Sequence, residues 1–346
     1  MRRILLTALL LLPLLGILVC CTDKDAVPGG RVRIMLGSQD VLLRSVTPGD
    51  GDEEDGGGVA YDAGDPDLVI LIANNSSGSI VKKYPTNGNL QPGADEFSMA
   101  VTFDGLTEGE YTVYAFANTT GLWDMESGGS PVTDLLACTT KTQVEALQFS
   151  ALASDTPPAL RNARLPLSAM GALSVSSLGT GEVDLDLVRC VSKVSLSFIN
   201  HTGDSLELDE FEFSLENLCP DQAYVLPVAL PTVPAGITYG DLSDTIGDDV
   251  TFTTEEVKTY SYLVFPGVAA PPSRSFLMNV WFKANGSATT SEFLDLPIHD
   301  NRAVDIVSLE RNQHLRISTR ISRGHTVSFN FEVAGWTEKE ELVRFD

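Results

Sequence analysis

Two adjacent cysteines, Cys20 and Cys21, end an apolar run at the start of the chain, and a thiol in that position can carry a lipid. Residues 4–19, "ILLTALLLLPLLGILV", are uncharged and follow two arginines. A membrane-spanning helix needs roughly 20 apolar residues, whereas a signal-peptide core needs about 7–15. The length is borderline, but Pro13, Gly16 and the abrupt polar end favour a secretory signal over a membrane span.

The end of the run resembles a bacterial lipobox, in which Leu and two small residues precede Cys. Leu18 stands three positions before Cys21, while the competing frame, with Cys20 as the acylated residue, has a poorer residue before its cysteine. Diacylglycerol on the thiol and an acyl chain on the freed amine anchor stably, because two or more chains are needed. The sequence predicts removal of residues 1–20, a lipidated tether at 21–29, acylation of Cys21 and a surface-exposed location at a bacterial outer membrane. An ordinary signal peptide with two incidental cysteines is the alternative.

Few residues in the chain have types and spacings that could bind a metal ion or catalyse a reaction. Asp50, Asp52 and Glu54 alternate as calcium ligands do in an EF-hand loop, but the turn glycine would fall at Asp55 and no suitably placed acid follows. A solvated acidic loop is the favoured interpretation. The four histidines stand apart, at His201, His299, His314 and His325.

Known catalytic motifs are also missing from the sequence. It contains no GxSxG, P-loop, GxGxxG or zinc-spaced Cys/His pattern. Paired acids for glycoside hydrolysis are a spatial arrangement, and choosing two among 47 acids would be arbitrary. The sequence predicts no catalytic, metal-binding or cofactor-binding residue, and a protein that is not an enzyme.

Composition narrows the classes of partner. The net charge is −24, and it becomes −26 once the two arginines of the signal are removed. A chain this acidic repels nucleic acid and anionic membrane surfaces. Three cysteines remain inside the chain, an odd and sparse number that provides no disulfide framework: Cys138, Cys190 and Cys219.

Period-two alternation of apolar and polar residues runs from end to end, as short strands require. "YTVYAFA" places Tyr111 and Val113 on one face and Tyr114 and Phe116 on the other. The same pattern recurs in "VSLSF" (194–198), "FEFSL" (211–215), "LRISTRI" (315–321) and "VSFNFEV" (327–333). Residues 132–152 are the best helical candidate, although "TTKTQ" dilutes them. We expect an all-β chain of two tandem β-sandwiches, of the transthyretin-like or Greek-key type.

Two stretches break the alternation. Residues 45–66, "SVTPGDGDEEDGGGVAYDAGDP", are Gly-rich and acidic and read as a loop or linker. Residues 153–168 contain paired prolines, which cannot continue a central strand. We therefore expect a first domain at about 30–165 and a second at 170–346.

Four segments resemble the fimbrillins, the Bacteroidetes family of pilus subunits and their anchors. They are "GLTEGEYTVYAFAN" (105–118), "LPLSAMG" followed by "DLDLVRCVSKVSLSF" (165–198), "LERNQHLRISTRI" (309–321) and "VAGWTEKEEL" (333–342). Ser192 stands where the family usually has alanine, and Leu315 replaces an aromatic residue. The residues after Cys21, "TDKD", also resemble the acidic stretch of surface-exposed Bacteroidetes lipoproteins. Each motif alone is weak, but together they cover nearly all of the mature chain.

The resemblance implies assembly by strand donation between subunits. An arginine-specific protease would remove a first strand lying within residues 31–44, after cleavage at Arg44, with Arg31 and Arg33 as competing points. The exposed groove would then recruit an extended segment of another subunit. The donor would be a terminal segment such as "EELVRFD" (340–346), which offers only a short apolar stripe. An anchor would instead keep its first strand and its lipid.

Three functions are compatible with these residues. The first is a fimbrial subunit or anchor that polymerises and supports adhesion, with other fimbrial subunits and the outer membrane as partners. The second is a surface lipoprotein that binds glycans, which would need exposed aromatics such as Trp123 or Trp281; with Trp336 these are scattered, and core packing is their commoner role. The third is a hydrolase, which would need paired acids in a cleft.

Overall fold

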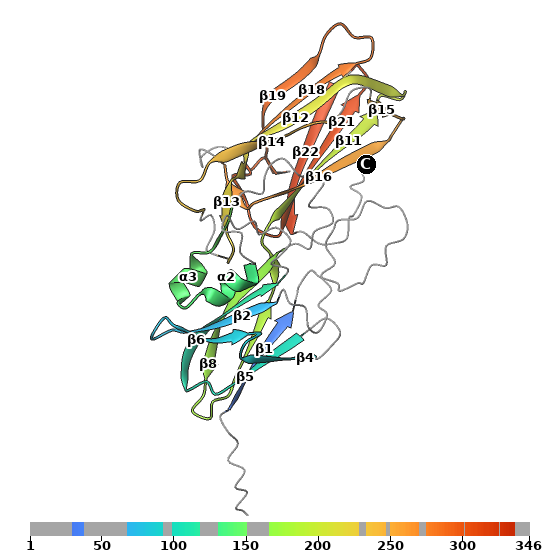
Figure 1. The fold of residues 1–346 in the computed structure, drawn as a ribbon. Coiled ribbons are helices and arrows are strands. Elements are labelled where there is room, and N and C mark those ends of the chain that lie inside the picture. Colours follow the sequence, from blue (N-terminus) through green and yellow to red (C-terminus); the bar gives the residue numbers. More distant parts are fainter. Residues whose placement is uncertain are drawn as a thin grey trace, which may run out of the picture.

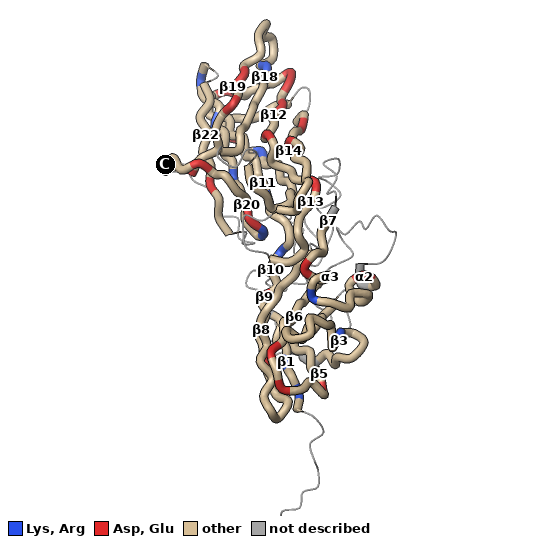
Figure 2. The backbone as a smooth tube through the Cα atoms, turned by 90° about the vertical axis from the view of Figure 1, so that its left-hand side faces the viewer, with Lys and Arg blue, Asp and Glu red and all other residues tan. Residues whose placement is uncertain are grey.

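The computed structural model describes residues 30–37, 68–92, 99–117, 131–150, 166–227, 233–246, 250–269, 275–300, 302–324 and 326–335. Almost all of its regular structure is β-strand, arranged as two sandwiches placed end to end (Figure 1). The predicted all-β, two-sandwich fold is confirmed. No helix of the described residues is both long and apolar enough to cross a membrane. Acidic residues occur along the chain in both sandwiches (Figure 2).

The first sandwich is made of two sheets. One has the order β4 (Gly88–Pro92), β5 (Met99–Asp104), β1 (Arg31–Gly37) and β9 (Gly181–Asp186). The other has the order β10 (Val188–Arg189), β8 (Leu167–Val175), β6 (Gly109–Ala117), β2 (Val69–Asn74) and β3 (Ile80–Tyr84). One apolar cluster, which includes Ile34, Val101 and Val113, fills the space between the two sheets.

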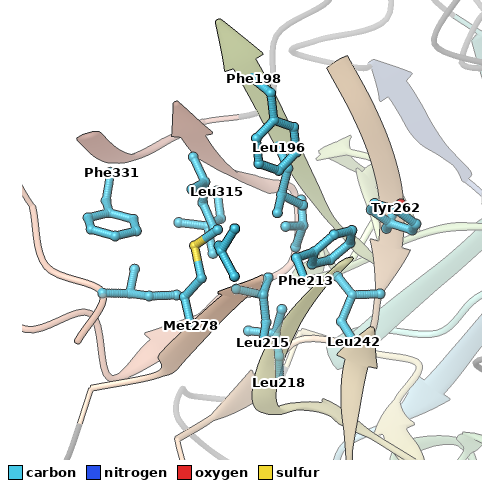
Figure 3. Packing of buried hydrophobic residues seen from close by; sticks show 14 of the residues in the cluster. Leu196, Phe198, Phe213, Leu215, Leu218, Leu242, Tyr262, Met278, Leu315 and Phe331 are labelled. Carbon is cyan, nitrogen blue, oxygen red and sulfur yellow. The ribbon is translucent and has the colours of Figure 1, made fainter. Parts of the chain in front are cut away.

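The second sandwich repeats this plan. One sheet has the order β16 (Val257–Val264), β11 (Ser192–His201), β21 (Gln313–Ser322) and β22 (Thr326–Gly335). The facing sheet has the order β14 (Tyr239–Thr245), β12 (Leu206–Pro220), β18 (Leu277–Ala284) and β19 (Ser291–Pro297), with β15 (Val250–Phe252) beside β12. Figure 3 shows Leu196, Phe213 and Leu315 from these sheets meeting in the core.

The alternating residues point where their spacing predicts. On β12, Phe211, Phe213 and Leu215 are buried in the second core, and the residues between them are more exposed. Strand β6 is buried on both faces: Tyr111 and Val113 pack in the first core, and Phe116 packs in a third cluster on the opposite side of the sheet. Period two assigned these faces correctly because successive side chains of a strand point to opposite sides.

The third cluster joins the two sandwiches. It combines Phe116 of β6 with Phe265, which follows β16, and with the segment that contains α2 (Pro131–Ala137), α3 (Lys141–Glu145) and β7 (Gln148–Ser150). Strand β7 pairs with β13 (Gln222–Tyr224), and β17 (Gly267–Val268) pairs with β20 (Ser308–Leu309). In place of the helix expected over 132–152, the structure has two short helices and a strand. The first helix ends at Ala137, and Thr140 begins the second as the N-cap of α3.

The division between the sandwiches differs from the expected boundary near 165–170. Strand β8 pairs with β6, and β9 pairs with β1, so both belong to the sheets of the first sandwich. The chain crosses to the second sandwich between β10 and β11. Composition placed the domain boundary at the proline-rich stretch. The actual boundary depends on which strands pair, and pairing joins residues far apart in the sequence, so a local compositional signal cannot reveal it.

Candidate functional site

The first strand lies inside its sheet although it comes from the start of the described chain. Strand β1 pairs antiparallel with β5 on one side and parallel with β9 on the other. Ile34, at its centre, is in register with Val101 of β5 and with Val183 of β9. A strand in this position has both rows of its backbone groups paired, so its removal would split the sheet.

The side chains of β1 alternate between core and surface. Val32, Ile34 and Leu36 are 0%, 0% and 2% exposed, respectively. They belong to the first core, and burying each contributes about 2 kcal/mol. The arginines that alternate with them form ion pairs: Arg31 Nε is 3.3 Å from Asp104 Oδ1 of β5, and Arg33 Nη1 is 3.9 Å from Glu182 Oε1 of β9. These ion pairs are largely exposed and contribute little, so apolar burial and the two ladders hold the strand.

The entry to this position is shaped by a glycine. Gly30 comes directly before β1 and packs against the turn that joins β8 to β9. A Cβ at Gly30 would stand 2.1 Å from the backbone oxygen of Leu178, so no larger residue fits there without moving the turn. Sequence inspection missed this role, because a glycine pair before a strand looks like an ordinary linker.

Without β1, the first sandwich would present a defined vacancy, which we call the β1 slot: the space between β5 and β9. Both strands would carry an unpaired row of N–H and C=O groups, and the core would open where Val32, Ile34 and Leu36 stood. Unpaired strand edges bind extended segments by β-augmentation, and alternate side chains supply the specificity. The shape of this space matches a strand that, like β1, has apolar residues at every second position.

Most of the predicted site residues lie outside the described residues. These are Cys20, Cys21, Arg44, residues 45–66, which include the acids considered as calcium ligands, and residues 340–346. The two competing cleavage points are described, and both lie on β1 itself. A protease needs an extended, accessible backbone, but Arg31 is paired with β5 and Arg33 is paired with both β5 and β9.

The histidines do not form a catalytic group. His201 is exposed and contacts Glu255, with 2.6 Å between Nδ1 and Oε1, and His299 Nδ1 contacts the backbone oxygen of Asp300 at 2.9 Å. His325 lies outside the described residues. Throughout the described ranges, no three His, Cys, Asp or Glu side chains gather as metal ligands would.

One Ser–His contact resembles a catalytic pair but lacks the required properties. His314 Nε2 is 2.8 Å from Ser195 Oγ, which is itself 2.9 Å from Ser261 Oγ. Burial, reinforced by the charges of Lys193 and Arg316, lowers the pKa of His314 to about 3. A histidine with so low a pKa is a weak base, and both His314 and Ser195 are buried in the sheet, at 2% and 5% exposure. The contact belongs to the packing of β21 against β11.

The tryptophans give the glycan-binding alternative little support. Trp281 lies half-buried on β18, in register with Glu212 of β12 and Glu292 of β19. Trp123 and Trp336 lie outside the described residues. A stacking platform for sugar rings needs exposed aromatic faces close together, and Trp281 offers one partly covered ring.

Comparison with known proteins relates the fold to solved structures. No protein-family model matches the chain, and no curated protein matches its sequence. A candidate cell adhesion protein from Parabacteroides distasonis aligns with a TM-score of 0.53 at 11% identity, over 91% of this chain and 99% of that one. The tip fimbrial protein of Porphyromonas gingivalis aligns with a TM-score of 0.52 at 12% identity, over 89% and 100%.

A fimbrilin from Porphyromonas gingivalis aligns equally well, with a TM-score of 0.52 at 11% identity over 90% of this chain and 98% of that one. In each case nearly the whole of both chains is covered, so the likeness extends to both sandwiches and their connection. Identity near one residue in nine shows a shared fold and nothing finer. This chain has the two-sandwich fold of the fimbrial and cell adhesion proteins of Bacteroidetes.

Proposed function

We propose that the protein is a surface fimbrial subunit, or the anchor of a fimbrium, and that it assembles with other subunits by strand donation in the β1 slot. The observation that carries this proposal is the position of β1: it is the first strand of the described chain, yet it fills the middle of its sheet and the core beneath it. A terminal strand in that position is the part of a sandwich that another chain can replace.

The chain around β1 suits such a replacement. Strand β1 ends at Gly37 and β2 begins at Val69, so a long segment separates them. Cleavage in this segment would release β1 without altering any other strand of the sheet. Arg44 belongs to this segment of the sequence, whereas Arg31 and Arg33 are residues of β1 itself. Arg44 is the proposed processing point, and a processed subunit would begin at Ser45.

The slot sets the requirements of a donor strand. A segment that follows the direction of β1 runs antiparallel to β5 and parallel to β9. It needs apolar side chains at the three positions now held by Val32, Ile34 and Leu36. The expected donor of this chain, residues 340–346, carries two apolar residues on one face, Val343 and Phe345. It would fill two of the three positions, and a neighbouring subunit with a longer stripe would bind more tightly.

The same proposal includes the lipid. Acylation of Cys21 would hold the precursor at the outer membrane, and an anchor would keep both the lipid and β1. Adhesion would then be a property of the assembled fimbrium. These finer statements rest on the lipobox, on the β1 slot and on the shared fold together.

Processing and assembly can be tested in a bacterium that carries the arginine-specific protease. We expect the surface form of the wild-type protein to begin at Ser45 by N-terminal sequencing and to run as a ladder on unboiled gels. Arg44→Ala should keep an acylated Cys21 at its start and remain monomeric. Arg31→Ala is the matched control and should behave as wild type, because Arg31 lies within the paired strand. A monomeric wild-type protein that starts at Ser45 would contradict strand donation.

A further inference from the structure

Strand β9 forms one wall of the β1 slot, and β1 is its sheet neighbour. Among the strands that the structure describes, β9 pairs with β1 alone, in a parallel register from Gly181 to Asp186. On the other wall, β5 also pairs with β4 and keeps a sheet partner when β1 is absent. When the slot is empty, β5 therefore remains hydrogen-bonded to β4, whereas β9 has lost the strand with which it pairs.

Two features hold β9 independently of β1. At its beginning, the turn from β8 is closed by a hydrogen bond that the backbone N–H of Ser176 donates to Thr180 O at 2.9 Å and by a contact between the two hydroxyl groups at 2.8 Å. At its end, β9 continues through Leu187 directly into β10 (Val188–Arg189), and the carbonyl groups of β10 are held by a side chain from the second sandwich.

That side chain is Arg311, in the turn between β20 and β21. Its guanidinium donates to four backbone carbonyl oxygens. The acceptors and their distances are Val188 O at 2.6 Å, Arg189 O at 3.1 Å, Ser168 O at 3.2 Å and Val225 O at 3.3 Å. Arg311 also donates to Ser168 Oγ at 3.0 Å. One planar group thus ties β10, which follows β9, to the start of β8 and to the second sandwich.

A second contact joins the same two segments in the opposite direction, because Arg189 of β10 donates to Asn312, the residue after Arg311. We call Arg311, its carbonyl acceptors and the Arg189–Asn312 pair the Arg311 clamp. Arg189, 2% exposed, donates from Nη1 to Asn312 Oδ1 at 3.0 Å. The backbone N–H of Asn312 donates to Val191 O at 2.9 Å. Charge-assisted hydrogen bonds to several fixed acceptors restrain both partners more than one neutral bond does.

We infer that Arg311 is a positioning residue for strand exchange: it keeps β9 at its distance from β5 while the β1 slot is empty. This inference rests on the proposed function. A wall that stays in place lowers the ordering cost of strand binding, because the incoming segment meets a preformed site. If β9 moved freely, each binding event would have to order its six residues again. Arg311 touches neither β1 nor β9, and it acts through β10.

The test uses the mature chain with a fluorophore at its N-terminus and a specific protease sequence in place of residues 50–55. Cleavage leaves the labelled β1 fragment bound without a covalent link to β2. Dilution and fluorescence anisotropy give its Kd and association rate, and an excess of unlabelled β1 peptide tests its replacement. Arg311→Lys keeps the charge but loses the fork that reaches several carbonyls.

For Arg311→Lys we expect a Kd about tenfold weaker than wild type, equivalent to about 1.4 kcal/mol, with most of the loss in the association rate. Backbone amides of residues 181–189 should also exchange hydrogen faster in the cleaved variant after β1 dissociates. Arg302→Lys is the control, because Arg302 is exposed and contacts Asp300, and it should match wild type. Should Arg311→Lys fail to fold, Ser168→Ala, which removes the hydroxyl group that accepts from Arg311, decides the question with a smaller expected loss of affinity of about threefold.

Two failures are distinguishable. If the wild-type fragment neither dissociates nor is replaced by the peptide, strand exchange itself is absent and the proposed function is wrong. If the wild-type slot exchanges its strand but Arg311→Lys binds it within twofold of wild type and protects residues 181–189 equally, the positioning role of Arg311 is overturned.

Discussion

Ile34 of β1 lies in parallel register with Val183 of β9, across a pairing that joins the start of the described chain to the last part of the first sandwich. On its other side Ile34 pairs antiparallel with Val101 of β5. The backbone of Ile34 joins β5 to β9, and its side chain is completely buried in the first core. Its position turns a short terminal strand into a structural requirement for the whole sandwich.

Ile34→Ala should destabilise the first sandwich by about 2–4 kcal/mol, because it removes buried methyl groups and leaves a cavity. Chemical unfolding followed by circular dichroism measures the loss. Met35→Ala is the matched control: the neighbouring side chain is on the outer face of β1 and half-buried, so its loss should stay below about 1 kcal/mol. Equal losses of stability for the two variants would contradict the assignment of Ile34 to the core face of β1 and of Met35 to its outer face.

Gly171→Ala should also destabilise the first sandwich. Gly171 of β8 lies beneath β9, where an added Cβ would stand 2.6 Å from Leu185 Cδ2 and 3.3 Å from Val183 Cγ2. Leu185 is 2% exposed and cannot turn into solvent. Overpacking of this kind costs about 1–3 kcal/mol, which exceeds the gain of about 0.4–1 kcal/mol from a less flexible unfolded chain.

Gly335→Ala provides the comparison for this change, since a Cβ there meets nothing within 4 Å. It should leave the unfolding midpoint unchanged or raise it slightly. The measurement is the difference between the two midpoints under identical conditions. A Gly171→Ala protein as stable as Gly335→Ala would show that β9 can move away from β8 freely, which would also weaken the proposed role of the Arg311 clamp.

The stability of the second sandwich should fall on mild acidification through His314. Burial lowers the folded-state pKa of His314 to about 3, from an unfolded value of 6.5. The unfolded chain therefore binds a proton that the folded chain excludes, and stability is lost as pH falls below 6.5. The slope from this residue is at most about 1.4 kcal/mol per pH unit.

His314→Gln should remove this slope between pH 6.5 and 4.5, as measured by urea unfolding at several pH values. Three carboxyl groups whose pKa values are lowered by hydrogen bonds that they accept contribute at lower pH instead: Asp221, Glu256 and Asp300. Their effect is centred on ordinary pKa values of 3.8 to 4.5 and is the same in the wild type and the variant, so the difference between the two slopes isolates His314. An unchanged slope in the variant would refute the assignment.

The thiol of Cys190 should report on the Arg311 clamp. Burial raises the pKa of Cys190, although the charge of Arg311, whose Nη2 is 3.4 Å from Cys190 Sγ, acts in the opposite direction. Buried, protonated thiols react slowly. In a chain starting at residue 22 with Cys138→Ser and Cys219→Ser, Cys190 should resist alkylation at pH 8 until the protein unfolds. Arg311→Lys should speed the reaction, and an equally slow reaction would show that the junction stays closed without the clamp.

Much of the local structure could be predicted from the residues. The alternation in residues 211–215 and 327–333 assigned the inward faces of β12 and β22 correctly, because period two follows from strand geometry alone. Residues 132–152 were expected as one helical candidate weakened by "TTKTQ", but the sequence did not show that Thr140 would begin a second helix as the N-cap of α3. The three internal cysteines are free in the structure: Cys138, Cys190 and Cys219.

The candidate site was only partly predictable. The first strand was placed within residues 31–44, and β1 occupies Arg31–Gly37. Nothing in "RVRIMLG" shows that the strand is central, or that β9 is its neighbour, because a strand carries no record of its partners in its own sequence. The roles of Gly30 and Arg311 were missed for the same reason: each depends on backbone atoms contributed by distant segments.

By itself the sequence determined the kind of chain: acidic, rich in short alternating strands, and able to build two apolar cores without disulfides. These properties depend on composition and on nearest-neighbour spacing, and both can be read in one dimension. The tertiary structure alone decided which strand completes the first sheet and which arginine joins the sandwiches. Such relationships are pairings between distant segments, and they exist once the backbone has brought those segments within hydrogen-bonding distance.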